Sequence, residues 1–232
     1  MHAARNVGVR ESHGDILVFT DPDCIAATDW LSQLDICFRN GQTVVGGSIG
    51  CYPGSYVDAS AHIVKFSKWL PHGPDGFRDD LATANFAITR KSFDVIGSFD
   101  ERFMSGDTEL SYRLRSRGFS LFFASKASVL HIHEVTLPGL LRERFFRGID
   151  FGSMRALREG WMPYTVALFT IGLPFLILRQ TYWKWKICKS TGLRRDFFKA
   201  AMPLFLCDFV WMLGVLFGSA KTVFPGSSLR IS

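Results

Sequence analysis

The chain has 232 residues and a formal net charge of +6, with 47% hydrophobic and 21% charged residues. This length allows one sizeable core, or a modest soluble domain followed by a membrane-attached tail. Basic residues beside apolar segments are more typical of contact with anionic lipid than with nucleic acid, and no helix-turn-helix, zinc-finger or aromatic RNA-reading motif accompanies them. We therefore expect membrane lipid and no nucleic acid among the partners.

The first part of the chain alternates between predicted strands and helices. Apolar runs predict strands at residues 15–20, 43–47, 81–88 and 119–131. Helical spacing predicts helices at residues 3–12, 29–39, 58–70, 91–96, 107–117 and 137–158. This alternation indicates an α/β domain, which we place at residues 1–160. Five cysteines without a CxxC pair, and a polar start without an apolar leader, favour a reduced, cytosolic domain.

The character of the chain changes after Pro163. Residues 164–178 carry no charge, and residues 200–219 carry only Asp208. At about 20 residues per span, such segments are near the lower limit for crossing a bilayer. We expect residues 161–232 to form membrane-associated helices, with Pro174 and Pro203 at kinks or ends. A pair of buried core helices is the alternative.

The connection between the two apolar segments, residues 179–199, is basic and contains two tryptophans, as is typical of an interfacial helix on an anionic leaflet. A single crossing would put this connection on the side opposite a cytosolic domain, against the positive-inside tendency. Two shallow re-entrant segments and a two-span hairpin both stay open. The basic residues of this connection include Lys184, Lys186, Lys189, Arg194 and Arg195.

Asp21-Pro22-Asp23 follows the first predicted strand directly. The carboxyl ends of strands are where open α/β sheets bind ligands. Two carboxylates at this place could hold a divalent cation against a diphosphate. Asp and Pro are also ordinary turn residues, so the tripeptide alone fits a simple turn as well.

Ser105-Gly106-Asp107-Thr108-Glu109-Leu110 opens a predicted helix. An acid in the first turn, such as Asp107, would be kept ionised by the positive end of the helix dipole beside a cleft, as a general base requires. These residues alone favour the alternative, in which Ser105 caps the helix and the acids only complement its dipole.

His131-Ile132-His133 ends the last predicted strand. We expect the two imidazoles to point to opposite faces, so that only one could face a given site. That histidine could complete the coordination of a cation or contact a diphosphate, and a purely structural histidine is the alternative.

The helix predicted at 137–158 is rich in arginine. Arg144 and Arg147 lie three residues apart on one face and could close over phosphate oxygens. For Arg155 and Arg158 we prefer a solvated or lipid-facing basic side.

An ordered series of runs links these elements. The runs are Ala4-Arg5-Asn6-Val7-Gly8, the stretch from Gly14 to Cys24, Thr83 to Arg90, Ile96 to Glu101, Asp107 to Leu114 and Val129 to His133. Together they resemble the middle of a family 2 glycosyltransferase, over residues 3–152. The resemblance implies a GT-A fold, a Rossmann-like α/β sheet of the nucleotide-diphospho-sugar transferases.

The resemblance also implies roles for the acids. Asp21 and Asp23 match the acid pair that contacts the nucleotide sugar and its Mg²⁺ or Mn²⁺, with Asp23 as the metal ligand. Asp107 matches the general base that deprotonates the acceptor hydroxyl for in-line attack with inversion.

Five further residues match positions around the donor. His131, with His133 as the weaker match, would lie near the diphosphate. Arg144 and Arg147 fall where family members place a basic loop or helix over the phosphates. Asn85 would line the pocket for the donor sugar or the acceptor.

Two departures from the family pattern stand out. The family's Glu-Asp pair is here Gly106-Asp107, so the acid before the base is absent. The chain also begins where family members have already passed through their first strands and nucleobase contacts. We expect a parallel GT-A sheet that lacks its first strands and exposes an apolar edge.

The leading hypothesis is a membrane-attached inverting glycosyltransferase that moves a sugar from a nucleotide-diphospho-sugar to a hydroxyl on a lipid-linked or glycan acceptor. The Gln-x-x-Arg-Trp signature of processive members is replaced by Arg144-Phe145-Phe146-Arg147, which favours single-sugar transfer. We expect the cell membrane, with the catalytic domain on its cytoplasmic side. The alternatives are a truncated, inactive membrane-associated remnant, or a nucleotidyltransferase, which would release diphosphate instead of a nucleoside diphosphate.

Overall fold

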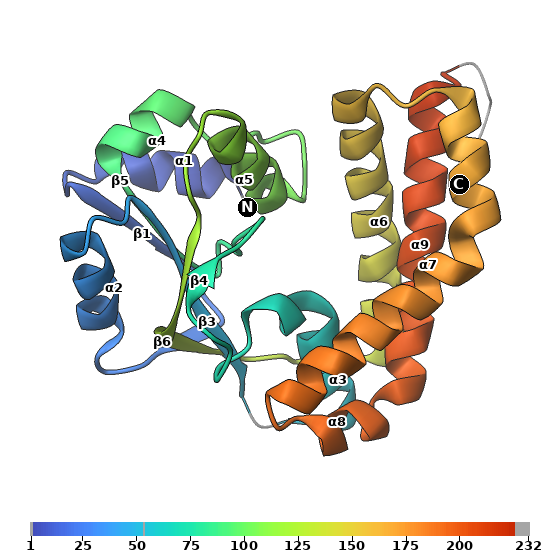
Figure 1. The fold of residues 1–232 in the computed structure, drawn as a ribbon, viewed down its shortest axis with the longest axis horizontal. Helices are drawn as coiled ribbons and strands as arrows, with labels where there is room; N and C mark the ends of the chain where they lie inside the picture. Colours follow the sequence, from blue (N-terminus) through green and yellow to red (C-terminus); the bar gives the residue numbers. More distant parts are fainter. Residues whose placement is uncertain (1, 53, 226–232) are drawn as a thin grey trace.

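A mixed sheet organises the N-terminal half of the computed structural model, which describes residues 2–52 and 54–225 (Figure 1). Within these residues the strand order is β1-β5-β3-β6-β2, and β4 pairs with the outer part of β6. The strands are β1 (Ile16–Thr20), β2 (Cys24–Ala26), β3 (Val44–Cys51), β4 (Gly76–Phe77), β5 (Asn85–Thr89) and β6 (Phe122–His131).

The pairing differs from the parallel sheet that the sequence predicts. Among the described strands only β3 and β6 run parallel, and the other pairs are antiparallel. The three-residue strand β2, which was not predicted, pairs with the end of β6 so that Cys24 lies opposite His131. This register brings the Asp21-Pro22-Asp23 turn beside His131 at the end of β6.

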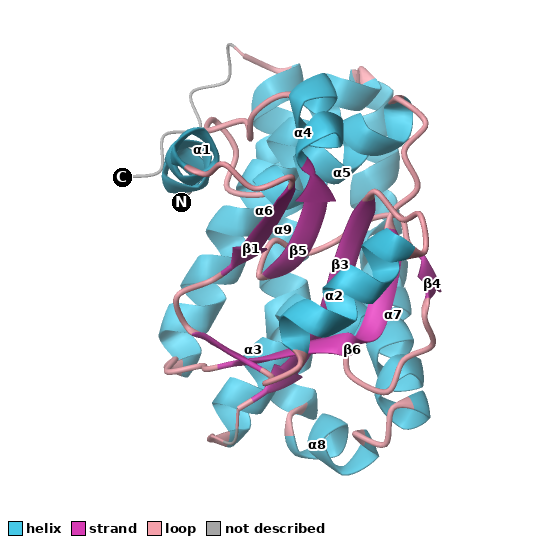
Figure 2. Ribbon diagram, turned by 90° about the vertical axis from the view of Figure 1, so that its left-hand side faces the viewer, coloured by secondary structure: helices cyan, strands magenta, loops and turns pink. Residues whose placement is uncertain are grey.

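Helices of the N-terminal half pack on both faces of this sheet, whereas α3 packs its apolar side chains against the C-terminal helices. The helix α2 covers one face, where Leu34 packs on Val45 and Ala87 (Figure 2). The larger core lies on the other face, beneath α4 and α5, and contains Phe19 and Phe99. The bounds are α1 (His2–Glu11), α2 (Trp30–Arg39), α3 (Tyr56–Phe66) with the 3₁₀ turn η1 (Ser67–Trp69), α4 (Arg90–Ile96) and α5 (Gly106–Ser116).

The rest of the chain forms long helices that stand together beside the sheet (Figure 1). Pro174 lies inside α7, which continues through it and changes direction along its length, as a proline within a helix causes (Figure 1). Pro203 lies in the first turn of α9. The helices are α6 (Leu137–Glu159), α7 (Pro163–Ser190), α8 (Arg194–Lys199) and α9 (Ala201–Val223).

Glycines bring the backbones of α6 and α9 into direct contact. A Cβ on Gly152 would lie 2.2 Å from the carbonyl oxygen of Val215, and one on Gly218 would lie 2.0 Å from that of Ile149. Ser219 donates its hydroxyl hydrogen to the Gly152 carbonyl at 3.2 Å. Glycines four apart on each helix thus form the small-xxx-small contact that lets two helices approach closely.

A buried ion pair joins α7 to α9. Lys184 donates to Asp208, and the Thr181 hydroxyl donates to the other carboxylate oxygen at 3.0 Å. Asp208 is fully buried and Lys184 nearly so. The sequence placed Lys184 in an exposed interfacial connection; that prediction is wrong for this residue, because its partner is the one acid of the second apolar segment.

By length and composition, α7 and α9 are the described helices that could cross a membrane. Only 11% of the apolar window of α7 is buried in the protein, against 44% for α9. Six of the large exposed apolar side chains of α7 recur at intervals of three and four residues and so share one face. They are Tyr164, Leu168, Ile171, Phe175, Leu178 and Tyr182.

Candidate active site

A cleft of about 1320 Å³ lies between the sheet domain and the helices α6, α7 and α9. It receives side chains from the ends of β1 and β6, from the first turn of α5 and from one face of α6. Six of the residues predicted to form the site line it: Asp21, Asp23, Asp107, His131, Arg144 and Arg147.

Asp23 and His131 meet at the junction of β2 and β6. The backbone N–H of Ile132 donates to the Asp23 carbonyl at 2.8 Å, which fixes the two strand ends together. The His131 Nε2 atom lies 3.6 Å from Oδ1 of Asp23. Its Nδ1 atom lies 2.8 Å from the Ile132 carbonyl oxygen, which can only accept, so Nδ1 carries the hydrogen. In the neutral ring the Nε2 lone pair is then directed toward Asp23.

These two side chains suit a divalent cation. A carboxylate oxygen and an oriented imidazole nitrogen are ligands that Mn²⁺ and Mg²⁺ accept, and the backbone bond at Nδ1 is the usual outer support of a ligating histidine. Cys24 also lies within reach. Burial raises the pKa of its thiol to about 11, and sulfur is a softer ligand than the oxygen and nitrogen that Mg²⁺ and Mn²⁺ accept.

The prediction that the two histidines point to opposite faces is wrong. Residues two apart in an extended chain point to the same face, and the ring of His133 follows that of His131 although β6 ends at His131. The two rings are stacked, with centroids 4.4 Å apart and an interplanar angle of 17°. His131 faces Asp23, whereas His133 faces His62 on α3. Burial lowers the pKa of His133 to about 4 and that of His62 to about 3.

Asp21 is held by the first helix. Arg5 on α1 donates to Oδ1 of Asp21 at 2.5 Å. The helix α1 is itself fixed by Asn6, whose amide group donates to the Phe99 carbonyl at 3.0 Å and whose oxygen accepts from the Phe99 N–H at 2.9 Å. Two of the runs that carry the family resemblance thus meet in space, and Arg5 lines the cleft beside Asp21.

Asp107 lies half-buried in the first turn of α5. Its Oδ1 accepts from the Thr108 N–H at 2.8 Å. Burial raises the pKa of Asp107 above its usual value, and the Thr108 hydrogen bond and the positive charge of Arg147 oppose this shift. Ser105 makes no side-chain cap bond. Instead its backbone N–H donates to Asp150 on α6 at 2.8 Å, which ties this turn to the opposite wall of the cleft.

The space beside Gly106, the residue before the predicted base, is occupied by a side chain from another helix. A Cβ on Gly106 would lie 2.6 Å from Nε2 of His2. The His2 ring stacks on Phe99 at 5.6 Å and contacts the Met104 carbonyl oxygen at 3.2 Å. The first acid of the family's Glu-Asp pair has no room here while α1 occupies this position.

The arginines of α6 differ in their partners. Arg147 donates through Nε to Glu143 at 2.8 Å, and Lys65 on α3 pairs with the same carboxylate at 2.8 Å. Arg144 is buried, with its guanidinium carbon 5.6 Å from the centre of the Trp211 ring. Its Nε atom has no hydrogen-bond partner among the described residues. Burial lowers the pKa of Arg144, yet it stays charged.

Comparison with known proteins shows similarity to proteins named as glycosyltransferases. No family model matches the chain. Glycosyltransferase AglE of Haloferax volcanii is 29% identical over 182 residues, which cover 76% of this chain and 57% of AglE. The O-antigen biosynthesis protein RfbC of Myxococcus xanthus is 25% identical over 155 residues, which cover 57% of this chain and 12% of RfbC. The chain thus spans little more than half of AglE and a small part of RfbC.

A solved structure settles the fold. The mannosyltransferase PcManGT from Pyrobaculum calidifontis, in complex with GDP-Man and Mn²⁺, matches with a TM-score of 0.52 and 14% identity, over 98% of this chain and 67% of that one. The chain is a relative of glycosyltransferases and has a GT-A fold. The predicted α/β class is therefore confirmed.

One predicted pocket residue lies elsewhere in this GT-A sheet. Asn85 is buried within the sheet and is not among the residues that line the cleft. Its Nδ2 group donates to the carbonyls of Ser48 and Ala127, both at 2.8 Å, and its oxygen accepts from Trp30 at 2.9 Å. These carbonyls lie where β3 and β6 change register, between Gly47 and Ser48, and Asn85 bridges them.

Several cleft residues of the GT-A domain and its helices were not predicted from the sequence. Arg155, expected on a solvated side, lines the cleft and lies 5.2 Å from the Trp161 ring. His2 and Arg5 come from α1, whose place beside Asp21 no local pattern indicates. The outer end of the cleft is apolar and basic together, with Phe169, Arg179, Trp183 and Trp211 in its lining.

Proposed function

We propose that this chain carries the reaction centre of a membrane-attached, inverting glycosyltransferase of family 2 type. It would move one sugar from a nucleotide-diphospho-sugar to a hydroxyl on a lipid-linked or glycan acceptor. The observation that supports this most is the single cleft shared by Asp23 and His131, by Asp107, and by Arg144 and Arg147. These are the three groups that such a transfer needs: a cation site, a base and cations for the leaving phosphates.

The base in this proposal is Asp107. The acceptor hydroxyl gives its proton to a carboxylate oxygen of Asp107 as its own oxygen bonds to the anomeric carbon. The bond from that carbon to the diphosphate breaks on the opposite side, so the sugar is inverted and a nucleoside diphosphate leaves. The raised pKa of Asp107 makes it a stronger base than an exposed aspartate once it is ionised.

The diphosphate needs positive charge as it leaves. Asp23 and His131 would hold Mg²⁺ or Mn²⁺, and such a cation neutralises the charge that builds on the diphosphate. Arg147 lies on the same cleft and can donate to phosphate oxygens with the guanidinium nitrogens that Glu143 does not use. Arg5 holds the Asp21 carboxylate in place at the edge of this site.

Membrane attachment is supported by the exposed apolar face of α7. A face of six large apolar side chains would be costly in water, and the helix is long enough to enter a bilayer. Exposed Arg179, Lys186 and Lys189 on the same helix suit an anionic, cytoplasmic leaflet. We propose the cell membrane as the location, with the cleft on its cytoplasmic side.

Binding of the donor is the first test. The chain is purified in detergent, and titration calorimetry measures UDP and GDP binding with and without Mn²⁺. We expect metal-dependent binding that Asp23→Asn removes, whereas Asp35→Asn, an exposed acid on α2 outside the cleft, leaves it intact. No metal-dependent binding of any nucleoside diphosphate would contradict the proposal and favour an inactive remnant.

Product analysis is the second test. A glycosyltransferase releases a nucleoside diphosphate and leaves the sugar on the acceptor with inverted configuration, which nuclear magnetic resonance of the anomeric proton reports. Release of inorganic diphosphate would instead identify a nucleotidyltransferase. Products that carry one added sugar would support the non-processive assignment, and a ladder of longer products would overturn it.

A further inference from the structure

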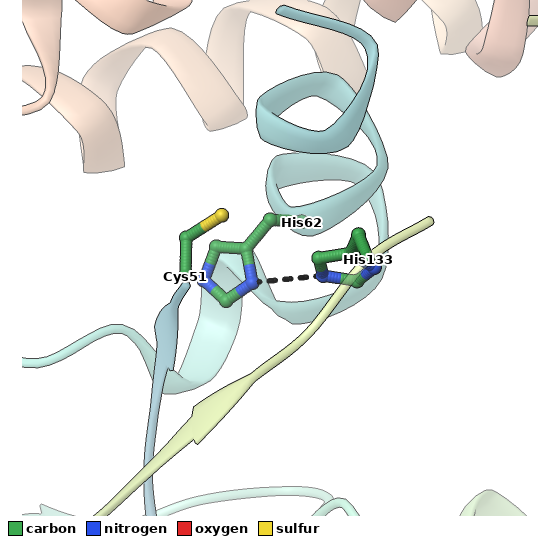
Figure 3. A group of neighbouring side chains, drawn as sticks. All are labelled: Cys51, His62 and His133. Carbon is green, nitrogen blue, oxygen red and sulfur yellow. Dashed lines mark hydrogen bonds between the residues drawn. The ribbon is translucent and has the colours of Figure 1, made fainter. Parts of the chain in front are cut away.

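A second group of metal-ligating side chains lies on the far side of the stacked histidines from Asp23. Cys51 ends β3, His62 lies in the middle of α3, and His133 follows β6. Figure 3 shows the three side chains in a row, with the His62 ring between the Cys51 sulfur and the His133 ring. The sulfur and one nitrogen of each ring lie within 4.8 Å of one another.

The two imidazoles are already spaced as ligands of one ion. Nδ1 of His62 lies 3.3 Å from Nε2 of His133. Two nitrogens at 2.0 to 2.1 Å from a tetrahedral Zn²⁺ are about 3.3 to 3.4 Å apart. The Cys51 sulfur is farther away and would have to move inward by roughly 1 Å to reach a Zn–S bond length. Cys51 is the last residue of its strand, where such a side-chain rotation is least restricted.

The surroundings of His62 also suit a metal ligand. Its ring is almost fully buried, and its Nε2 atom has no hydrogen-bond partner among the described residues. Cys51 and His62 line a small cavity of about 290 Å³ that also receives Tyr52 and Ser55. With a metal on Nδ1, the hydrogen of His62 would be on Nε2, and the cavity has room for water to accept it and to fill a fourth metal position.

We propose that Cys51, His62 and His133 bind a zinc ion. The ligand set of one sulfur and two imidazoles is softer than the oxygen and nitrogen of Asp23 and His131, so the two sites would select different metals. This inference does not rest on the proposed transferase activity. The ends of β3 and β6 already pair, and the zinc would add a link from both to α3, which contacts the segment after β6 through the hydrogen bond from the Val135 N–H to Asp58 at 3.2 Å.

The site would also position the donor-site histidine. His133 stacks on His131 with centroids 4.4 Å apart, and Phe66 packs against both rings. A metal that fixes His133 therefore limits the movement of His131, whose Nε2 faces Asp23. Zinc here would be a positioning ion for the neighbouring site rather than a reactant.

The experiment measures zinc in the purified chain with the donor site disabled. The Asp23→Asn variant is stripped with a chelator, loaded with Zn²⁺, desalted and assayed by mass spectrometry for metal content. We expect about one zinc per chain, and an affinity lowered by more than about 100-fold when Cys51→Ser is added, beyond the usual cost of losing an outer-shell partner. Cys37→Ser, half-buried on α2, is the matched control and should keep the zinc.

Cobalt gives a readout of the ligands themselves. Co²⁺ in place of zinc should show the visible bands of a tetrahedral site and a near-ultraviolet thiolate-to-cobalt band. Cys51→Ser should lose the thiolate band, and Cys24→Ser should keep it. If Cys51→Ser binds as much zinc as its parent, or if the thiolate band is absent from the parent, the proposed site does not exist.

Discussion

The ring of His2 lies where a β-carbon on residue 106 would be, because an ideal Cβ at Gly106 falls 2.6 Å from the His2 Nε2 atom. The approach of α1 to the first turn of α5 thus depends on a residue without a side chain. Gly106 stands where the family 2 pattern that the sequence resembles has the first acid of a Glu-Asp pair. The departure has a local steric reason, since His2 and Arg5 of α1 stand in the cleft beside Asp107 and Asp21.

Gly106→Ala should destabilise the fold. Its methyl group would overlap the buried His2 ring and force a shift costing about 1–3 kcal/mol. A fall in the midpoint of thermal unfolding, followed by circular dichroism, measures this. His2→Ala in the same chain should recover most of the loss by opening the space. Gly8→Ala is the control, because nothing lies near its added Cβ and α1 should gain about 0.5–1 kcal/mol. Equal midpoints for Gly106→Ala and the unchanged chain would contradict the steric account.

Asp107→Asn should abolish turnover but leave nucleotide binding intact. Loss of a general base costs about 10²- to 10⁴-fold in rate. Because the carboxylate is the active form, and burial raises the pKa of Asp107, turnover in the unchanged chain should fall as the pH drops through a value above 3.8. The pH dependence of kcat measures this limb. Arg147→Met should move the limb to higher pH, since the positive charge that favours ionised Asp107 is lost. A limb that does not respond to Arg147 would point to another base.

Asn85→Asp should lower stability without changing the cleft. A carboxylate facing the carbonyls of Ser48 and Ala127 loses two donated hydrogen bonds and gains repulsion. Each buried group left unsatisfied costs about 1–3 kcal/mol. Denaturant unfolding should show the loss, whereas the KM for the donor, measured on folded protein, should stay the same. A raised KM for the donor with unchanged stability would instead indicate that Asn85 lines the donor pocket.

Gly152→Val should separate α6 from α9. Its side chain would enter the backbone of Val215, where even a Cβ lies 2.2 Å from the carbonyl oxygen. Backbone atoms cannot rotate away as a side chain can, so we expect loss of the folded protein from detergent extracts. Gly172→Val on α7 is the comparison, since its Cβ would have only a side-chain carbon at 4.0 Å nearby. Similar yields of the two variants would argue against a close helix contact.

We expect the buried ion pair of Lys184 and Asp208 to stabilise the fold by more than the sum of what each side chain contributes alone. Lys184→Met leaves a fully buried carboxylate with only the Thr181 hydroxyl, and loss of one partner of a buried pair costs about 3–5 kcal/mol. The double variant Lys184→Met with Asp208→Leu removes both charges and should recover much of that loss. A double-mutant cycle of unfolding midpoints in detergent measures the coupling. Additive effects would mean that the two charges do not interact.

Local patterns predicted most of the elements. The apolar runs and turn residues placed α1, β1, α4, α5 and α6 close to their bounds, because each of these elements has a regular period or a clear stop signal. The strand β2 was missed, since Cys24-Ile25-Ala26 is too short for a period and exists only through its pairing with His131. The prediction of a parallel sheet was wrong, because an alternation of strands and helices does not by itself fix whether neighbouring strands run parallel.

The positions of cleft residues were predictable where they depend on the local sequence. They were not predictable where they depend on contacts between distant parts of the chain. Asp23, Asp107 and His131 stand at the ends of their elements, and such positions can be read from sequence. Asn85 lies in one of the runs that resemble the family, but its side chain bonds a carbonyl at the register shift between β3 and β6. Only the pairing of the strands reveals this. The burial of Lys184 likewise depends on Asp208, 24 residues away, and no period within α7 indicates it.

The glycine contact between α6 and α9 has a consequence for how the cleft meets a membrane. The helix α6 carries Arg144 and Arg147, and its backbone rests on α9 at Gly152 and Gly218 without side chains between them. Two helices whose backbones are in contact cannot slide past each other as helices separated by flexible side chains can. If α9 enters a bilayer, α6 moves with it, because the two helices form one rigid unit. The depth at which α9 settles would then fix how far above the lipid headgroups a sugar can be handed over, and so how long a reach the acceptor needs.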